Sequence, residues 1–202
     1  MTQLQRYRVI ILSLLLSTSC LAQQHLSFMG IPINGTINSF ELKLKAKGLM
    51  PDRESNKSRP YGERMFNGLY IGRECTFLVR YTGKTKTVYG IEIRFSDENQ
   101  NKVIRFESDF IEGVKKKYKG SHLIGEENSI SDKTVYIYNA KDANNYSWDN
   151  VVGILKTEWM TIRAIPRESY SDLKEKIIST VTIYYIDKVN TELRDEENAS
   201  DI

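Results

Sequence analysis

Histidines, cysteines and paired carboxylates build most catalytic and metal sites, and this sequence spaces them widely. It contains 2 His and 2 Cys, and His25 and His122 lie far apart along the chain, which disfavours a zinc site. The carboxylate pairs Asp97-Glu98 and Glu126-Glu127 fall in polar, turn-like stretches, where charged side chains are ordinarily solvated. These residues therefore give no basis for a metal centre and little basis for acid–base catalysis.

The motifs of the common enzyme classes are missing as well. The sequence has no G-x-S-x-G elbow, no Walker loop, no dinucleotide-binding G-x-G-x-x-G and no H-E-x-x-H. The stretch 97–101 resembles a calcium loop in composition, but it lacks the D-x-D-x-D spacing and the Glu at the twelfth position. We therefore expect no enzyme, no metal and no cofactor. A glycosidase-like enzyme, which needs two carboxylates across a sugar, is the alternative.

One polar loop carries two large aromatic side chains. Residues 144–150 read NNYSWDN, so amides and a carboxylate flank Tyr146 and Trp148. Tyr and Trp in loops are frequent anchors of binding surfaces, because they present a large area at a low entropy cost. Both are candidate partner-binding residues, and the same flanking groups would suit a glycan. The alternative is that Trp148 folds back over a sheet edge.

Two alternating segments predict a β-hairpin around which the chain is organised. Residues 74–81 and 88–95 alternate apolar and polar side chains, and the polar link 82–87 has a glycine near its start. Cys75 lies on the apolar face, where we expect a small buried hydrophobe rather than a nucleophile. Alternation places Thr76, Leu78, Arg80, Val88, Glu92 and Arg94 on the other face. From that face we select as candidate partner-binding residues Leu78, Arg80, Glu92 and Arg94.

Further helices and strands surround this hairpin. Apolar spacing and cap residues predict a helix over 36–47 that Thr36 caps, and a helix over 108–119 that Ser108 caps after a turn at 96–102. Strands are predicted over 25–33, 65–71, 134–139, 151–156, 159–165 and 180–187. The segment 167–179 fits either a short helix or a hairpin connection. The acidic tail 190–202 predicts a frayed helix or disorder.

These patterns predict an α+β fold, in which two helices pack on an antiparallel sheet. The sequence also contains a faint internal echo. Asn38-Ser39-Phe40 is matched by Ser108-Asp109-Phe110, and Val88-Tyr89-Gly90-Ile91 is matched by Val151-Val152-Gly153-Ile154. A tandem helix-then-sheet repeat is therefore a hypothesis, with one domain over 23–189 divided into halves 23–104 and 105–189.

The first 22 residues have the three zones of an export signal. Arg6 and Arg8 supply positive charge, 9–16 is apolar, and 17–22 is rich in small residues. Because the apolar run is shorter than the roughly 20 residues that span a bilayer, we do not expect the mature protein to span a membrane. Loss of the two arginines lowers the formal net charge from +3 to +1, which gives no argument for a nucleic-acid partner.

Two fates of this leader remain open. Cleavage after Ala22 would give a periplasmic or secreted protein, and this is the interpretation we favour. Lipid attachment at Cys20 would instead give an outer-membrane lipoprotein, but Ser17 stands where such signals usually carry Leu.

The opening HLSFMGIPINGTINSFELKLKAKGL resembles that of a group of uncharacterised secreted proteins from Gram-negative gut anaerobes. The helix-then-sheet repeat is similar to the β-lactamase-inhibitor-protein-like fold and to the smaller domain of the outer-membrane assembly lipoprotein BamE. These resemblances imply a periplasmic binding module. No functional residue is carried over, because a fold does not determine a function.

The sequence therefore predicts a secreted or periplasmic, non-catalytic binding module whose partner is a protein. A sheet face that the helices leave free would supply the surface. A carbohydrate-binding module and a structural component of the envelope are the alternatives. The basic cluster Lys115-Lys116-Lys117 with Lys119 is expected to be a solvated helix face, and contact with anionic lipid headgroups is its alternative.

Overall fold

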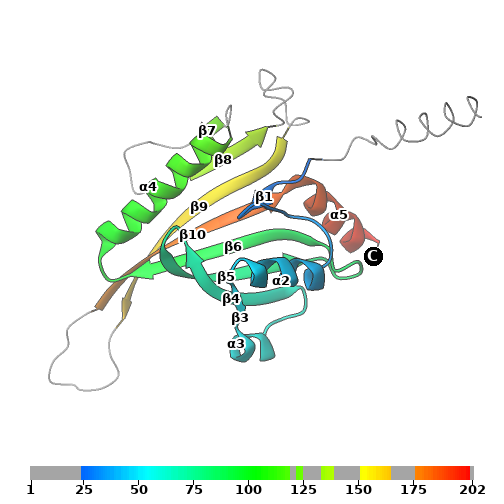
Figure 1. Ribbon diagram of the computed structural model, residues 1–202, viewed down its shortest axis with the longest axis horizontal. Helices are drawn as coiled ribbons and strands as arrows, with labels where there is room; N and C mark the ends of the chain where they lie inside the picture. The colour runs from blue at the N-terminus through cyan, green and yellow to red at the C-terminus, as the bar shows by residue number, and fades with distance from the viewer. Residues whose placement is uncertain (1–23, 119–121, 125–132, 139–150, 165–175, 201–202) are drawn as a thin grey trace, which may run out of the picture.

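One large antiparallel sheet organises the protein, as a computed structural model shows for residues 24–118, 122–124, 133–138, 151–164 and 176–200 (Figure 1). Its eight strands follow the order β3-β4-β5-β6-β10-β9-β8-β7. The strands are β3 (Met50–Pro51), β4 (Glu63–Tyr70), β5 (Arg73–Tyr81), β6 (Val88–Asp97), β7 (His122–Ile124), β8 (Lys133–Tyr138), β9 (Val151–Ala164) and β10 (Lys176–Asp187). The predicted α+β class and the central β5–β6 hairpin are confirmed.

Helices and a small hairpin cover one face of the sheet (Figure 1). The long helix α4 (Gln100–Lys117) packs on β6 and β10, and α2 (Ile37–Ala46) lies on the same face with the hairpin of β1 (Ser27–Phe28) and β2 (Ile31–Pro32). The short α3 (Arg53–Lys57) flanks β4, and α5 (Lys188–Ala199) packs against β6, β9 and β10. None of the helices in the described ranges has the length and apolar composition of a membrane span.

The hydrophobic core fills the space between the covered face and the helices. Strand register sets Phe77, Ile93 and Ile183 side by side on β5, β6 and β10, and all three are buried. Phe40 reaches this core from α2 and Phe106 from α4. Burying a side chain of this size stabilises the fold by roughly 1.5–3 kcal/mol, so the alternation seen in the sequence fixes which face the helices cover.

The residues between these core positions form the opposite face of the sheet. Leu78, Glu92 and Tyr184 occupy one row of that face, since Glu92 is the register partner of both other residues. Among the described residues no helix covers this face, which we call the uncovered face (Figure 1).

A β-bulge turns Val88 away from the uncovered face. Arg80 pairs with Gly90 but Tyr81 pairs with Val88, so β6 has one extra residue at this point. Val88 is therefore fully buried in the core, and its predicted position on the polar face is wrong. The prediction assumed strict alternation along the strand. The extra residue of a bulge reverses which side chains point to each face beyond it.

The first predicted helix is confirmed, together with both of its end signals. The Thr36 side chain caps α2 by accepting a hydrogen bond from the Ser39 N–H at 3.5 Å. The helix ends before Gly48, whose φ of 88° few other residues adopt without strain.

The second predicted helix exists but begins earlier than expected. Helix α4 starts at Gln100 with Asn99 as its N-cap, and the Asn99 side chain accepts from the Asn101 N–H at 3.0 Å. Ser108, the predicted cap, lies in mid-helix and donates to the Ile104 carbonyl at 3.0 Å. The predicted turn at 96–102 is therefore shorter and ends where the helix begins.

Several strand boundaries also differ from the prediction. Residues 151–164 form the single strand β9, where a break between 156 and 159 was expected. The opening segment 25–33 is a tight hairpin, β1–β2, rather than one strand. Residues 176–179 belong to β10, while 165–175 lie outside the described residues. The acidic tail forms α5 from residue 188 to 199, so of the two predicted alternatives the helix is confirmed and disorder is not.

The order of elements repeats along the chain. Helix α2 precedes β3 to β6, helix α4 precedes β7 to β10, and the last strands of the two sets pair at the centre of the sheet. The residue matches found in the sequence do not follow this symmetry, because 88–91 lies in β6 and 151–154 in β9, whereas β10 is the counterpart of β6. The boundary after residue 104 falls within α4. A gene duplication stays a prediction.

Candidate functional site

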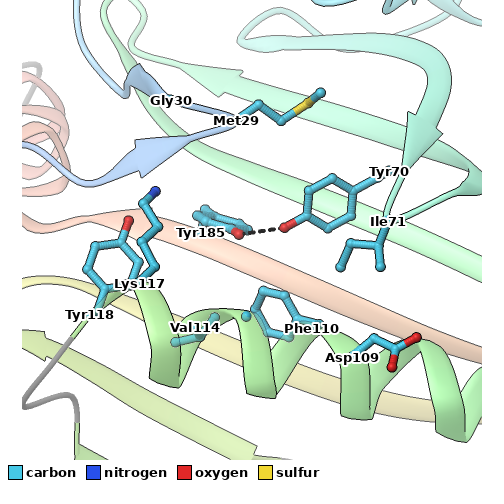
Figure 2. A pocket seen from close by; sticks show the side chains of 11 residues that line it. Met29, Gly30, Tyr70, Ile71, Asp109, Phe110, Val114, Lys117, Tyr118 and Tyr185 are labelled. Atoms are coloured by element: carbon cyan, nitrogen blue, oxygen red, sulfur yellow. Dashed lines mark hydrogen bonds between the residues drawn. The ribbon is translucent and has the colours of Figure 1, made fainter.

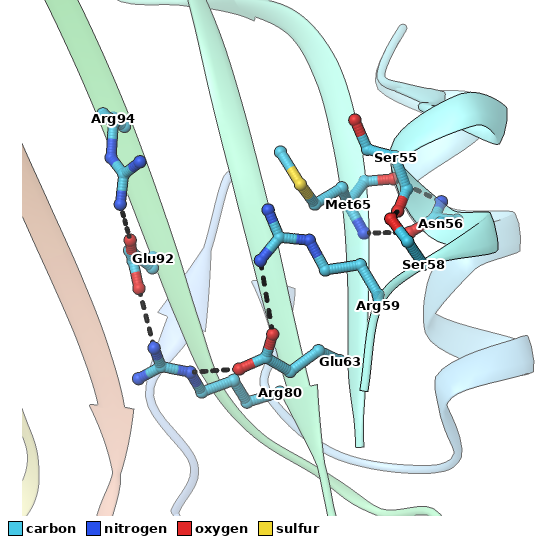
Figure 3. Close-up of polar contacts among 9 residues, drawn as sticks. All are labelled: Ser55, Asn56, Ser58, Arg59, Glu63, Met65, Arg80, Glu92 and Arg94. Atoms are coloured by element: carbon cyan, nitrogen blue, oxygen red, sulfur yellow. Dashed lines mark hydrogen bonds and ion pairs between the residues drawn. The ribbon is translucent and has the colours of Figure 1, made fainter. Parts of the chain in front are cut away.

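The uncovered face carries a connected network of ion pairs (Figure 3). The Glu92 side chain, only 7% exposed, accepts hydrogen bonds from Arg80 Nη2 at 2.9 Å and from Arg94 Nη2 at 2.8 Å. Glu63 on β4 continues the network, with ion-pair distances of 3.7 Å to Arg80 and 3.6 Å to Arg59. Because each charge has an opposite partner, these long side chains are ordered before any ligand binds.

A second polar group extends this surface over β9 and β10. Glu158 forms an ion pair with Lys156 and accepts a hydrogen bond from the Tyr184 hydroxyl at 2.7 Å. The hydrogen bonds from Lys156 and Tyr184 hold the pKa of Glu158 below its usual value. Burial, reinforced by the bond to Glu158, raises the pKa of Tyr184. Glu158 is thus a carboxylate and Tyr184 a neutral phenol at neutral pH.

An apolar depression of about 660 Å³ adjoins the charged network. Met50 and Leu69, which are 64% and 61% exposed, line it together with Arg94. Register places Met50 opposite Asn67 and Leu69 opposite Glu74, on the uncovered face. Exposed apolar side chains next to ordered charges have the composition of a non-obligate protein interface.

The middle of β4, beside the depression, already has partners for its edge backbone groups. The Asn56 amide donates to the Met65 carbonyl at 2.9 Å and accepts from the Met65 N–H at 2.7 Å (Figure 3). The short β3 pairs with the next two residues of β4. Unpaired edge groups can recruit another chain, and at these residues of β4 that route is blocked.

The structure brings the four predicted hairpin residues together. Leu78, Arg80, Glu92 and Arg94 lie on the uncovered face of two neighbouring strands, as alternation required. Tyr146 and Trp148 lie outside the described residues, so their role as anchors stays a prediction.

Sequence reasoning missed the residues that flank these four. Met50 and Leu69 belong to β3 and β4, and Glu158 and Tyr184 to β9 and β10. Alternation along 63–70 was the signal that could have placed Leu69 with Leu78. No local pattern in the sequence indicated that β10 lies beside β6. These are the last strands of the sets β3–β6 and β7–β10, and they are far apart along the chain.

Two residues whose side chains could take part in catalysis, Cys75 and Asp97, have structural roles instead. Burial raises the pKa of the Cys75 thiol to about 12, and the residue is 4% exposed, so the predicted buried hydrophobe is confirmed. Asp97 accepts from the Asn99 N–H at 2.8 Å and from Lys102 Nζ at 3.1 Å, which holds the start of α4. Within the described ranges no three His, Cys, Asp or Glu side chains cluster so as to hold a metal ion.

Comparisons of this chain with protein-family models, with curated proteins and with solved structures find no match. The resemblances inferred from the opening residues and from the helix-then-sheet plan therefore stay predictions. Its function has to be argued from the geometry of the uncovered face.

Proposed function

We propose that this chain is an exported, non-catalytic binding module whose uncovered sheet face binds another protein. The observation that carries the proposal is the exposed apolar pair Met50 and Leu69 beside the ordered network of Arg80, Glu92 and Arg94. The leader supports export. Intact-mass analysis of the exported protein tests it, because a start at Gln23 indicates secretion and a lipid-modified Cys20 indicates anchoring.

The geometry favours binding over hydrolysis. Glu63 and Glu92 are both ion-paired with Arg80 on the same face of the sheet, so this pair does not provide two carboxylates that face each other across a sugar. A pre-ordered polar surface instead lowers the entropy cost of association and sets the orientation of a partner. Apolar side chains in a depression provide the anchoring contacts that dominate interface energies.

Site-specific photocrosslinking tests the proposal. A photoreactive amino acid replaces Leu69, the exported protein is irradiated in its envelope, and the crosslinked polypeptide is identified and purified. We expect Leu69→Ser to weaken binding of that polypeptide by about thirtyfold, since the loss of an apolar anchor costs about 2 kcal/mol.

Leu42 provides the matched control. It is 69% exposed, but it lies on α2 over the covered face. A photoreactive residue there should give no crosslink to the same polypeptide, and Leu42→Ser should leave the affinity unchanged. Equal crosslinking from both positions would remove the uncovered face as the site. Capture of glycan without protein would replace the proposal with the carbohydrate alternative.

A further inference from the structure

A second concavity, of about 500 Å³, lies on the covered side of the sheet (Figure 2). Phe110 and Val114 of α4 form one wall, and the two hairpin turns that carry Met29 and Ile71 form the other. Tyr70 and Tyr185 meet at the back, where their hydroxyl groups are 2.8 Å apart and hydrogen-bonded. Because these hydroxyls satisfy each other, the interior presents a mainly apolar lining. Its volume falls within the roughly 300–1,000 Å³ of ligand pockets.

Gly113 lies at the rim of this pocket, at a cost to α4. Glycine inside a helix is about 1 kcal/mol less favourable than alanine. No packing explains it, because a methyl group at Gly113 would meet no atom within 4 Å. Gly113 is exposed and lines the pocket, so a long side chain at this position has open space in front of it and reaches the pocket from its rim.

Both turns at the mouth of the pocket are two-residue hairpin turns, a type that requires positive φ at both central residues. Met29 and Ile71 have φ angles of 49° and 50°, and glycines at 30 and 72 complete the two tight turns. A β-branched residue with positive φ is a genuine outlier, and such strain costs of order 1–3 kcal/mol. The β-branched Ile71 in a left-handed conformation and the glycine inside α4 thus border the same pocket, and both depart from the residue preferences of their elements.

The charges at the rim indicate the polarity of that ligand. Lys117 and Asp109 lie at opposite ends of the pocket, about 12 Å apart along α4 by its rise per residue (Figure 2). Lys117 Nζ donates to the Ser27 carbonyl at 3.2 Å, and an ammonium group has three donors, so further donors remain. Lys115 and Lys116 precede it in the last helical turn, which makes this end cationic.

We propose that the pocket binds a single-chain anionic amphiphile, such as a fatty acid, independently of the uncovered face. The acyl chain lies between α4 and the two turns, towards the Tyr70–Tyr185 pair. The anionic group lies at Lys117 and away from Asp109.

Calorimetric titration of the full chain with monomeric dodecanoate tests this assignment. We expect saturable binding, and dodecyltrimethylammonium, which carries the opposite charge, should bind at least about tenfold more weakly. Gly113→Met should reduce the dodecanoate affinity by at least about tenfold, since its side chain takes the space of several methylene groups. Lys117→Gln should reduce the affinity about threefold, as for a solvent-exposed ion pair.

Stability measurements separate pocket filling from unfolding. Gly113→Ala and Gly113→Met should unfold at no lower urea concentration than the native chain, because both improve helix propensity. Ser108→Ala improves the same helix away from the pocket and should leave dodecanoate binding unchanged. Native affinity in Gly113→Met, or equal affinity for the two amphiphiles, would overturn the proposal. So would binding to phosphatidylglycerol vesicles without binding to monomeric dodecanoate.

Discussion

Individual residues of the uncovered face were predictable wherever strand geometry alone sets their direction. Leu78, Arg80, Glu92 and Arg94 follow from period-two alternation, which needs no knowledge of the rest of the fold. The predicted face of Val88 was wrong because the bulge at Tyr89 reverses the alternation. No residue type in this stretch indicated the bulge. Gly153 shows a further limit of prediction from sequence. Position 153 requires glycine because of close contacts with Ile186 and Leu26, which are far away along the chain.

Gly153→Ala should destabilise the protein by about 2 kcal/mol, within the range of overpacking substitutions. A Cβ atom there would lie 2.6 Å from the Ile186 carbonyl oxygen and 3.0 Å from Leu26 Cδ2. The first neighbour is backbone of the adjacent strand β10, so it cannot swing aside as a long side chain would. Urea unfolding of the purified variant measures the change in free energy.

Gly83→Ala is the control for this substitution. Gly83 lies in the exposed loop between β5 and β6, and a methyl group there would meet no atom within 4 Å. We expect a change within about 0.5 kcal/mol, as for most surface substitutions. Equal losses in both variants would show that the close approach at Gly153 relaxes without cost.

At the scale of elements, helix α4 shows why the position of a cap is harder to predict than the existence of a helix. The apolar positions Phe110, Ile111 and Val114 marked the helix, and all three are buried. The polar composition of residues 96–102 predicted a turn over the whole stretch. The N-terminal half of α4 is stabilised by packing of Val103 and Phe106 on the sheet, which is a tertiary effect.

Asn99→Ala should cost about 1 kcal/mol of stability, since it removes the side-chain oxygen that accepts the Asn101 N–H. Ser108→Ala should be neutral or slightly stabilising, because Ser108 is exposed and bonds back to the Ile104 carbonyl within the helix. Thermal and urea unfolding of the two variants give the comparison. If Ser108→Ala were the more damaging, the helix would begin where the sequence pattern had placed it.

At the scale of the whole molecule, the order of strands in the sheet could not be read from the sequence. Hairpin pairs such as β4–β5 follow from short turns, but the β6–β10 pairing joins segments separated by the entire second half. The α+β class was accessible because helical and alternating periods are local properties. The β6–β10 pairing depends on how the two halves of the sheet share one hydrophobic core with the helices, which is a property of the whole fold.

The two ends of the described chain meet at a buried polar junction. Asp187 is fully buried and caps α5 through the Asn190 N–H at 3.0 Å, and it also accepts from the Leu26 N–H at 2.8 Å. The Asn190 amide donates to the carbonyls of Ile33 and Val88 at 2.7 and 2.8 Å. Helix α5 is therefore held by the N-terminal segment and the central hairpin, which explains why the acidic tail is ordered.

Glu197 fastens the other end of α5 to the β5–β6 loop. Its carboxylate accepts from the Thr85 hydroxyl at 2.6 Å and from the N–H groups of Lys84 and Thr85 at 2.9 and 3.3 Å. Burial on its own would raise the pKa of Glu197, but these hydrogen bonds outweigh it and the pKa is lowered from 4.5. The charged form is therefore the one that the folded state prefers.

This lowered pKa gives stability a defined dependence on pH. The contribution of Glu197 is fully present above its unfolded-state pKa of about 4.5, and it is lost as the pH falls through the folded-state pKa. Glu197→Gln should thus lower the free energy of unfolding by about 1 kcal/mol near pH 7, allowing for solvent screening. The difference between the native chain and the variant should be smaller near pH 3 than near pH 7 and should vanish below the folded-state pKa, because protonation removes the charge that the variant lacks.

Urea titrations of both proteins at the two pH values measure this convergence. Glu196→Gln is the matched control, because Glu196 is an exposed neighbour on the same helix. We expect it to change stability little at either pH. A loss in Glu197→Gln that is equally large at both pH values would mean that the side chain stabilises the loop by packing or neutral hydrogen bonds. The charge of the carboxylate would then play no part in docking α5 on the loop.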